Sequence, residues 1–235
     1  MPFHVGICDT VLTRNFSQHP FVPSDEAARA HICDEILTIQ AMGLKKRLSH
    51  TNAKSAVVGI SGGLDSTLAL LVTAKAFDML GRDKKEIIAV TMPCFGTTDR
   101  TYNNACEMTR QTGATLIEVP IGEAVNVHFR DIGHDPDVHD VTYENAQARQ
   151  RTYLLMDFAN EYNGMVIGTG DMSELALGWA TYNGDHMSMY GVNASVPKTL
   201  VRHLVQHAAD TTENESLRQV LYDVLDTPVS PELLP

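Results

Sequence analysis

The sequence predicts an α/β fold in which an open parallel sheet carries helices on both of its faces. From residue 56 onward, short apolar runs of strand length alternate with longer amphipathic segments, which is typical of βαβ units. A glycine-rich turn follows the first apolar run directly, where a connection from a strand to a helix is expected. Because such crossovers are right-handed, the helices are expected to cover both faces of the sheet.

The amino-terminal part of the chain differs from the rest. Residues 1–23 carry no sustained period and contain prolines that interrupt regular structure, so we expect a linker or arm. Ser24 is expected to cap a helix that has Asp25 and Glu26 in its first turn, near the positive end of the helix dipole. We therefore expect residues 24–235 to form one domain.

The remaining elements follow in order along the chain. The expected strands are short and apolar: Ala56–Ile60, Ile87–Met92, Leu116–Val119 and Met165–Ile167. The expected helices have apolar residues at helical spacing: Ser66–Leu80, Tyr102–Thr112, Glu144–Glu161, Lys198–His207 and Glu213–Asp226. Residues 183–199 have little period and many polar groups, which is typical of a functional loop.

Composition excludes several classes of protein. The chain has 18 Lys and Arg against 29 Asp and Glu, a formal net charge of −11, which counts against nucleic acid as a main partner. No stretch approaches the roughly 20 apolar residues of a membrane-spanning helix, so we expect no membrane partner. The four cysteines show no CxxC pairing and fit a reducing cytoplasm, where we expect the protein to reside.

The segment after the first strand predicts a phosphate-binding loop. There, Gly62 and Gly63 let the backbone approach phosphate oxygens, and the hydroxyls of Ser61 and Ser66 can donate to them. The following helix directs free N–H groups and its positive end at an anion. Asp65 in the same loop needs a cation between itself and a phosphate, which indicates Mg²⁺. Neither GxxxxGK[ST] nor GxGxxG is present.

A second glycine turn, Gly168–Gly170, follows the last expected strand and also carries acids. Glu174 is placed to be a second metal carboxylate at the carboxyl end of that strand, where open α/β sheets bind ligands. A plain helix start also explains Asp171 and Glu174, because acids in the first turn stabilise the helix dipole. Both interpretations stay open at this point.

Three motifs together resemble one family. SGGLDST, GTGDMSELALGWATY and GDHMSMYGVNASVPKT closely resemble the synthetase domain of glutamine-dependent NAD synthetase, a PP-loop ATP pyrophosphatase with an adenine nucleotide alpha hydrolase-like, Rossmann-like fold. The resemblance runs from about Pro20 to the end of the chain and includes HPFVP, YENAQARQR and SPELLP. It implies ATP-dependent adenylation of the nicotinate carboxylate of deamido-NAD, followed by amidation with ammonia. The products would be NAD, AMP and pyrophosphate.

The resemblance also implies roles for the residues that match the family motifs. ATP would be bound by Ser61, Gly62, Gly63, Ser66 and Thr169. Magnesium would be bound by Asp65 and Glu174, and Lys198 matches a lysine that contacts phosphate during catalysis. Mg²⁺ and Lys198 would both offset charge repulsion, because the nicotinate carboxylate must approach the polyphosphate before it can attack the α-phosphorus.

Further matches concern deamido-NAD and ammonia. Asn145 and Arg149 match contacts to deamido-NAD and lie four residues apart on an expected helix, on one face. Trp179 matches an aromatic residue beside the pyridine ring. Asp185 matches an acid near the ammonia position, where a desolvated carboxylate could attract ammonium and accept its proton. Asp185 as an acid that merely stabilises a loop turn stays an alternative.

The resemblance has limits that shape the expectations. Family members that use glutamine carry an amino-terminal glutaminase domain, and nothing before Pro20 is long enough to hold one. The family also continues beyond SPELLP, so we expect a domain truncated at its carboxyl terminus. Because the deamido-NAD site of the family lies at a homodimer interface, we expect a homodimer.

Two alternative functions and one alternative site remain. The chain could be another PP-loop ligase, although its acidity and lack of paired cysteines count against a tRNA substrate. It could also be a non-catalytic adenine-nucleotide-binding protein, since fold alone does not fix function. Residues 133–140 hold two histidines and three acids, which could indicate zinc or a solvated loop.

Overall fold

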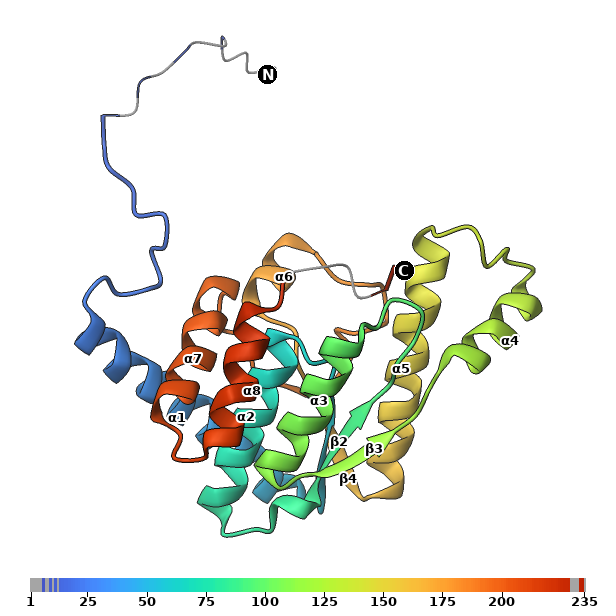
Figure 1. Cartoon of the computed structure of the whole chain (residues 1–235), viewed down its shortest axis with the longest axis horizontal. Helices are drawn as coiled ribbons and strands as arrows, with labels where there is room; N and C mark the ends of the chain where they lie inside the picture. The colour runs from blue at the N-terminus through green and yellow to red at the C-terminus, as the bar shows by residue number, and fades with distance from the viewer. Residues whose placement is uncertain (1–5, 7–8, 10, 12, 229–232, 235) are drawn as a thin grey trace.

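The computed structural model describes residues 6, 9, 11, 13–228 and 233–234. It confirms the predicted α/β class, with a five-stranded sheet whose neighbouring strands all pair in parallel (Figure 1). The spatial order is β3-β2-β1-β4-β5. The strands are β1 (Ser55–Gly59), β2 (Ile87–Thr91), β3 (Thr115–Glu118), β4 (Gly164–Gly168) and β5 (Tyr190–Gly191).

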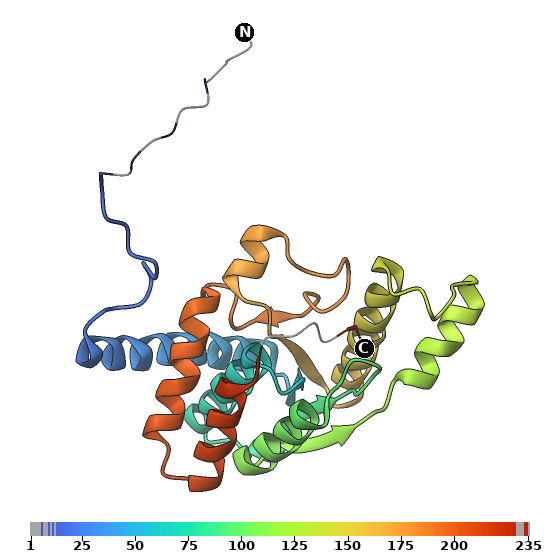
Figure 2. The same ribbon diagram turned by 45° about the horizontal axis from the view of Figure 1, so that its top comes forward.

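Side chains of the central strands alternate between the two faces of the sheet and take part in a buried apolar cluster on each face. In β1, Ala56 and Val58 point to one face and Val57 to the other, and all three are fully buried. Five helices pack on the first face: α1 (Glu26–Thr51), α2 (Leu64–Leu80), α3 (Asp99–Thr112), α7 (Lys198–Thr211) and α8 (Glu215–Asp226). The second face is covered by α4 (Gly122–Ile132) and α5 (Val141–Glu161), as Figure 2 shows.

The strand order creates one point where the direction of winding reverses. From β1 the chain winds outward through β2 to β3, and it then crosses back to place β4 on the other side of β1. Val58 of β1 pairs with Ile167 of β4, so these strands end side by side. In open α/β sheets, ligands bind outside the carboxyl ends of such a strand pair.

Element boundaries differ from the predictions in places. Asp25, not Ser24, caps α1, because the Asp25 carboxylate accepts a hydrogen bond from the Ala28 N–H at 2.6 Å. Neither α4 nor β5 was predicted from the sequence, and the short helix α6 (Met172–Leu177) was only one of two interpretations of its segment. The described residues before Glu26 contain no helix or strand, and the division into arm and domain stays a prediction. Within the described residues, no helix is long and apolar enough to cross a membrane.

Candidate nucleotide and metal site

The loop between β1 and α2 has the geometry of an anion-binding turn. Gly62 adopts a φ of +85°, and a Cβ there would lie 2.0 Å from the Thr101 carbonyl oxygen, so only glycine fits. Gly63 is the N-cap of α2, and no side-chain hydrogen bond caps this helix. The first N–H groups of α2 are therefore available to an anion.

The two serines of this loop bracket the turn. Ser61 Oγ lies 3.2 Å from Ser66 Oγ, and it accepts a hydrogen bond from the Gly63 N–H at 3.2 Å. Ser66 Oγ donates to the Gly63 carbonyl oxygen at 3.2 Å. The four residues predicted to hold phosphate are thus brought together in one turn, with both hydroxyls next to the free helix end.

The second part of the site is the loop that follows β4. Asp171 Oδ1 accepts hydrogen bonds from the N–H groups of Ser173 at 2.6 Å and Glu174 at 3.0 Å, and Glu174 Oε2 accepts from the Asp171 N–H at 3.2 Å. This reciprocal capping box starts α6. The helix-start interpretation is therefore correct, and it leaves one oxygen of each carboxylate, Asp171 Oδ2 and Glu174 Oε1, to face the site.

Lys198, the first residue of α7, contacts both the segment after β1 and the segment after β4. Its ammonium contacts Asp65 Oδ2 and lies 3.1 Å from Asp171 Oδ2 and 3.3 Å from Glu174 Oε1. The Lys198 N–H also donates to Ser173 Oγ at 3.0 Å, which fixes the start of α7 against α6. Three acids from two loops and one lysine from a third element therefore meet at the carboxyl ends of β1 and β4.

Burial and charge act in opposite directions on this cluster. Burial raises the pKa of Asp65 to about 6, although the hydrogen bond and charge of Lys198 favour the ionised form. Burial lowers the pKa of Lys198, but the hydrogen bond to Asp65 and the charges of Asp65 and Glu174 outweigh it and raise that pKa overall. Lys198 is therefore positively charged at neutral pH, among acids that outnumber it.

The donor set of the cluster suits a hard divalent cation. Ligand atoms of Asp65, Asp171 and Glu174 lie within 4.8 Å of one another, the one such group of three among the described residues. Asp65 Oδ1 and Asp171 Oδ2 are buried and accept no hydrogen bond, so both have free lone pairs. Carboxylate oxygens are the ligands that Mg²⁺ prefers. Asp171 was not among the predicted ligands, although its place after the β4 glycine turn was a usable signal.

Asn193 is a second residue that the sequence analysis missed. Its side chain is fully buried, and Nδ2 donates to the carbonyl oxygens of Asp65 and Thr169, both at 3.0 Å. Its Oδ1 accepts from Gln40 Nε2 at 3.1 Å. Asn193 therefore connects the phosphate loop to the loop after β4, which carries the predicted ATP contact Thr169. An isolated asparagine in a polar loop gave no signal for this.

The residues predicted to bind deamido-NAD lie on α5 and after α6. Arg149 Nε donates to the Tyr182 carbonyl oxygen at 3.0 Å, so α5 holds the loop that follows α6. Asn145 precedes it by about one helical turn on the same helix. Trp179 directly follows the C-cap of α6, and its side chain is 80% exposed. An aromatic ring this exposed is free to stack on a ligand.

The environment of Asp185 differs from the expectation. Its side chain is exposed, and its carboxylate accepts hydrogen bonds from the N–H and the hydroxyl of Thr181 within the same loop. The predicted desolvation is therefore absent, because the acid stabilises a turn at the surface. The loop-turn interpretation describes this arrangement, and a role toward ammonia stays a proposal.

Comparison with known proteins decides the family. The sequence model of the NAD synthase family matches residues 36–221. The chain belongs to the NAD synthase family. Glutamine-dependent NAD(+) synthetase of Mycobacterium tuberculosis is 45% identical to it over 233 residues, which cover 97% of this chain and 34% of that protein. The chain thus spans about a third of the length of the curated relatives it matches.

Solved structures agree with this assignment. Glutamine-dependent NAD+ synthetase from Acinetobacter baumannii, in complex with ADP, superimposes with a TM-score of 0.74 at 29% identity, over 80% of this chain and 35% of that one. NMN synthetase from Francisella tularensis gives a TM-score of 0.72 at 23% identity, over 86% and 77% of the two chains, and shows the fold alone. The predicted resemblance to the synthetase domain is confirmed.

The acids and histidines of residues 133–140 serve the loop and the start of the next helix. His134 Nε2 lies 3.1 Å from the Val138 carbonyl oxygen, and Asp140 caps α5 by accepting from the N–H groups of Thr142 and Tyr143. Within the described residues, no three ligand atoms of this segment converge as a metal requires. Most of these residues are exposed, as the solvated-loop interpretation expects.

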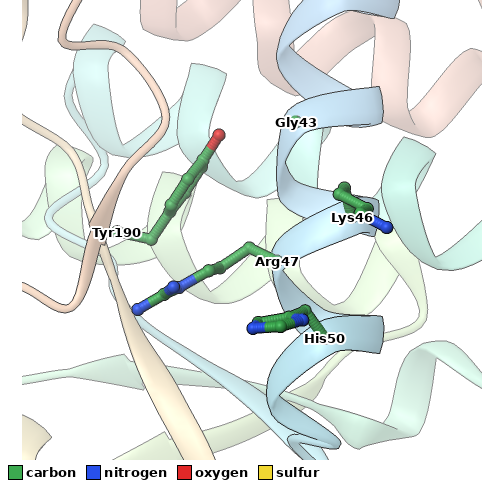
Figure 3. A pocket seen from close by; sticks show the side chains of 5 residues that line it. All are labelled: Gly43, Lys46, Arg47, His50 and Tyr190. Atoms are coloured by element: carbon green, nitrogen blue, oxygen red, sulfur yellow. The ribbon is translucent and has the colours of Figure 1, made fainter.

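A basic hollow of about 370 Å³ lies on α1 beside β5 (Figure 3). It is lined by Gly43, Lys46, Arg47, His50 and Tyr190, none of which is a predicted site residue. The Tyr190 ring packs against α1 so closely that a Cβ at Gly43 would lie 2.5 Å from its hydroxyl oxygen. The hollow is therefore a consequence of how β5 docks on α1, apart from the acid cluster at the strand ends.

Proposed function

We propose that this chain is the synthetase part of an NAD synthase. It adenylates the nicotinate carboxylate of deamido-NAD with ATP and then amidates the product with ammonia, giving NAD, AMP and pyrophosphate. The observation that supports this best is the contact of Lys198 with Asp65, Asp171 and Glu174 beside the uncapped start of α2. A phosphate loop, a candidate metal site and the Lys198 ammonium meet there, at the carboxyl ends of β1 and β4, where the winding direction of the sheet reverses.

In the first step, the chain holds the β- and γ-phosphates as the leaving group. These phosphates are bound through hydroxyl and N–H donors of Ser61, Gly62, Gly63 and Ser66. Thr169, in the loop after β4, lies near the nucleotide. A nicotinate carboxylate oxygen attacks the α-phosphorus, and the bond to the β-phosphate oxygen breaks with its electron pair leaving on pyrophosphate. Lys198 stabilises the charge that develops on that leaving group.

Magnesium is the proposed metal, with Asp65 and Glu174 as ligands. When bound, the ion would offset the repulsion between the nicotinate carboxylate and the polyphosphate. The half-buried Asp65 lies at the start of α2 beside the phosphate loop, and Asn193 holds its backbone there. Glu174 is fixed by the capping box of α6. The two acids therefore keep their spacing without the ion, which is what a preorganised site needs.

In the second step, ammonia attacks the activated carbonyl carbon and AMP leaves. Asn145, Arg149 and Trp179 hold deamido-NAD, and the link from Arg149 to the Tyr182 carbonyl oxygen ties this half of the site to the loop that carries Asp185. Asp185 attracts ammonium and accepts the proton that must be lost before nitrogen can attack. Deamido-NAD covering the loop would supply the desolvation of Asp185 that the surface position lacks.

Partners follow from the relatives. The matched relatives are named glutamine-dependent, and we propose that a glutaminase domain supplies ammonia to this chain. A homodimer would cover the exposed apolar side chains Leu175, Leu177 and Trp179. The free thiols of Cys33, Cys94 and Cys106 suit the cytoplasm.

The test is product formation from defined substrates. Purified chain is mixed with deamido-NAD, ATP, magnesium and ammonium chloride, and NAD, AMP and pyrophosphate are measured. We expect equal amounts of all three and no AMP without deamido-NAD. AMP release with another acceptor carboxylate and none with deamido-NAD would indicate a different ligase. ATP binding without AMP release under any condition would indicate a non-catalytic nucleotide-binding protein. Gel filtration with light scattering measures the oligomer.

A further inference from the structure

Three carboxylates converge on the ammonium of Lys198, as they would on a metal ion. Their ligand atoms lie within 4.8 Å of one another, and the ammonium is 3.1 Å from Asp171 Oδ2 and 3.3 Å from Glu174 Oε1, in contact with Asp65. Magnesium binds oxygen ligands at about 2.0–2.1 Å and calls for near-ideal geometry. A cation that used these three acids would therefore take the position that the ammonium has here.

Asp171 is the most constrained of the three acids. Its side chain is fully buried, its Oδ1 is used by the start of α6, and its Oδ2 is buried without a hydrogen bond and faces the ammonium. A buried carboxylate oxygen that no N–H or O–H satisfies is costly unless a cation balances it. A positive charge at this point, from Lys198 or from a metal, therefore stabilises the buried Asp171 carboxylate.

Lys198 can leave the cluster without disturbing the fold. Its side chain is 43% exposed, and its backbone is already fixed by the helix start and by Ser173. The flexible stem can move the ammonium while α7 stays in place. A polyphosphate bound to the neighbouring loop at Gly62 and Gly63 is the group that would attract it.

We propose that the cluster is a cation-exchange site in which Asp171 is the third carboxylate of the metal centre. A divalent metal and the Lys198 ammonium occupy it in turn, and the metal enters when nucleotide phosphate draws the lysine away. This rests on the magnesium role in the proposed function and deepens it. It means that the protein takes up little metal on its own, so that metal and nucleotide bind together.

The test measures binding of Mn²⁺ alone to the whole chain, by electron paramagnetic resonance, without nucleotide. Lys198→Met removes the ammonium and keeps the apolar stem, so Mn²⁺ should bind about tenfold or more tightly than to the wild type. Asp171→Asn in the Lys198→Met background should reverse that gain. Asparagine caps helices as well as aspartate does, so this change removes the charge and keeps the start of α6.

Two controls accompany these variants. Asp140→Asn changes an acid at the N-cap of α5, away from the cluster, and should leave Mn²⁺ affinity unchanged. Lys198→Gln is a second variant without the ammonium, used if Lys198→Met does not fold by circular dichroism, and it should also bind Mn²⁺ more tightly. Mn²⁺ affinity equal to or below that of the wild type in a folded Lys198 variant overturns the exchange.

The proposal that Asp171 is a metal ligand is tested separately by the double variant. A double variant that binds Mn²⁺ as tightly as Lys198→Met overturns Asp171 as a ligand. These outcomes are separate from failure of the proposed function, which the wild-type protein tests by NAD formation. A wild type that forms NAD while the Lys198 variants gain no Mn²⁺ affinity leaves the function standing and removes the exchange.

Discussion

The side-chain amide of Asn193 donates a hydrogen bond to the backbone carbonyl oxygen of Asp65, 128 residues earlier in the chain. The same amide nitrogen donates to the Thr169 carbonyl oxygen, so one fully buried side chain sets the spacing of the loops after β1 and β4. Since ATP is proposed to bind across these loops, the distance between them bears directly on nucleotide affinity.

Asn193→Ala should raise the KM for ATP and lower stability by about 1–3 kcal/mol, because the carbonyl oxygens of Asp65 and Thr169 each lose the hydrogen bond from the buried Asn193 amide. Steady-state kinetics and thermal unfolding measure the two effects. Gln40→Ala is the matched control, since Gln40 contacts the Asn193 side chain but neither of the two loops. It should change the KM much less. An unchanged KM in Asn193→Ala, with reduced stability alone, would limit Asn193 to a structural role.

Gly62→Ala should abolish ATP binding in a protein that still folds. A Cβ at this position meets the Thr101 backbone at 2.0 Å, and the φ of +85° adds strain, so the loop must move. Gly81→Ala is the control, because Gly81 also has a positive φ, of +64°, but a Cβ there meets no atom within 4 Å. Calorimetric titration with ATP separates the two variants. Normal ATP affinity in Gly62→Ala would mean that the turn does not contact phosphate.

Trp179→Ala should raise the KM for deamido-NAD several-fold with little change in melting temperature, because its side chain is 80% exposed and contributes little to the core. Trp179→Phe should recover part of the loss, since a smaller ring still stacks. The KM for ATP measured on the same samples serves as the internal reference. A loss that phenylalanine does not recover would argue against stacking on the pyridine ring.

Asp223→Asn should lower the melting temperature by about 2–4 °C at neutral pH. Arg100 donates to both carboxylate oxygens of Asp223, and with Asn104 this holds the pKa of Asp223 below its ordinary value of 3.8. A lowered folded pKa stabilises the protein above 3.8, and the contribution disappears as pH falls through the folded pKa. The difference between variant and wild type should therefore shrink as pH falls below 3.8 and through the lowered folded pKa of Asp223.

Glu215→Gln is the comparison for this ion pair. Glu215 pairs with Arg218 on α8, and its side chain is 75% exposed, so its loss should shift the melting temperature little at any pH. A pH-independent difference between Asp223→Asn and the wild type would assign its effect to hydrogen-bond geometry rather than to charge.

The chain assayed by itself should form NAD with ammonium chloride and not with glutamine. Glutamine hydrolysis needs an activated nucleophile, and burial instead raises the pKa of the thiols of Cys33, Cys94 and Cys106. Cys8, the remaining cysteine, lies outside the described residues. Ammonium-free stocks are needed as a control. Comparable NAD formation from glutamine would contradict the prediction.

The parts of the fold that the sequence predicted are those with strong local patterns. The central strands β1 and β2 are buried on both faces, so their sequences are nearly continuous apolar runs. The two-residue strand β5 has no such pattern, because it is defined by pairing of Tyr190 and Gly191 with the end of β4. A strand fixed by its partner leaves no trace in its own composition.

The candidate site was predictable where a local motif carries it. The glycine turn at Gly62 requires particular residues in a row, so the sequence alone indicated it. Asp171 and Asn193 gain their importance from burial against segments far away in the chain, which no local pattern encodes. Asp185 shows the opposite case: the sequence predicted a desolvated acid, but the exposure of an acid depends on what covers it.

The position of β1 between β2 and β4 also governs how the chain must fold as it is made. β2 is the next strand after β1 in the chain, but β4 comes only after the long helix α5, so the other edge of β1 has no partner strand until β4 is made. An open edge on an apolar strand is a template for pairing with other chains. Until β4 is made, this edge of β1 is therefore open to pairing with another chain.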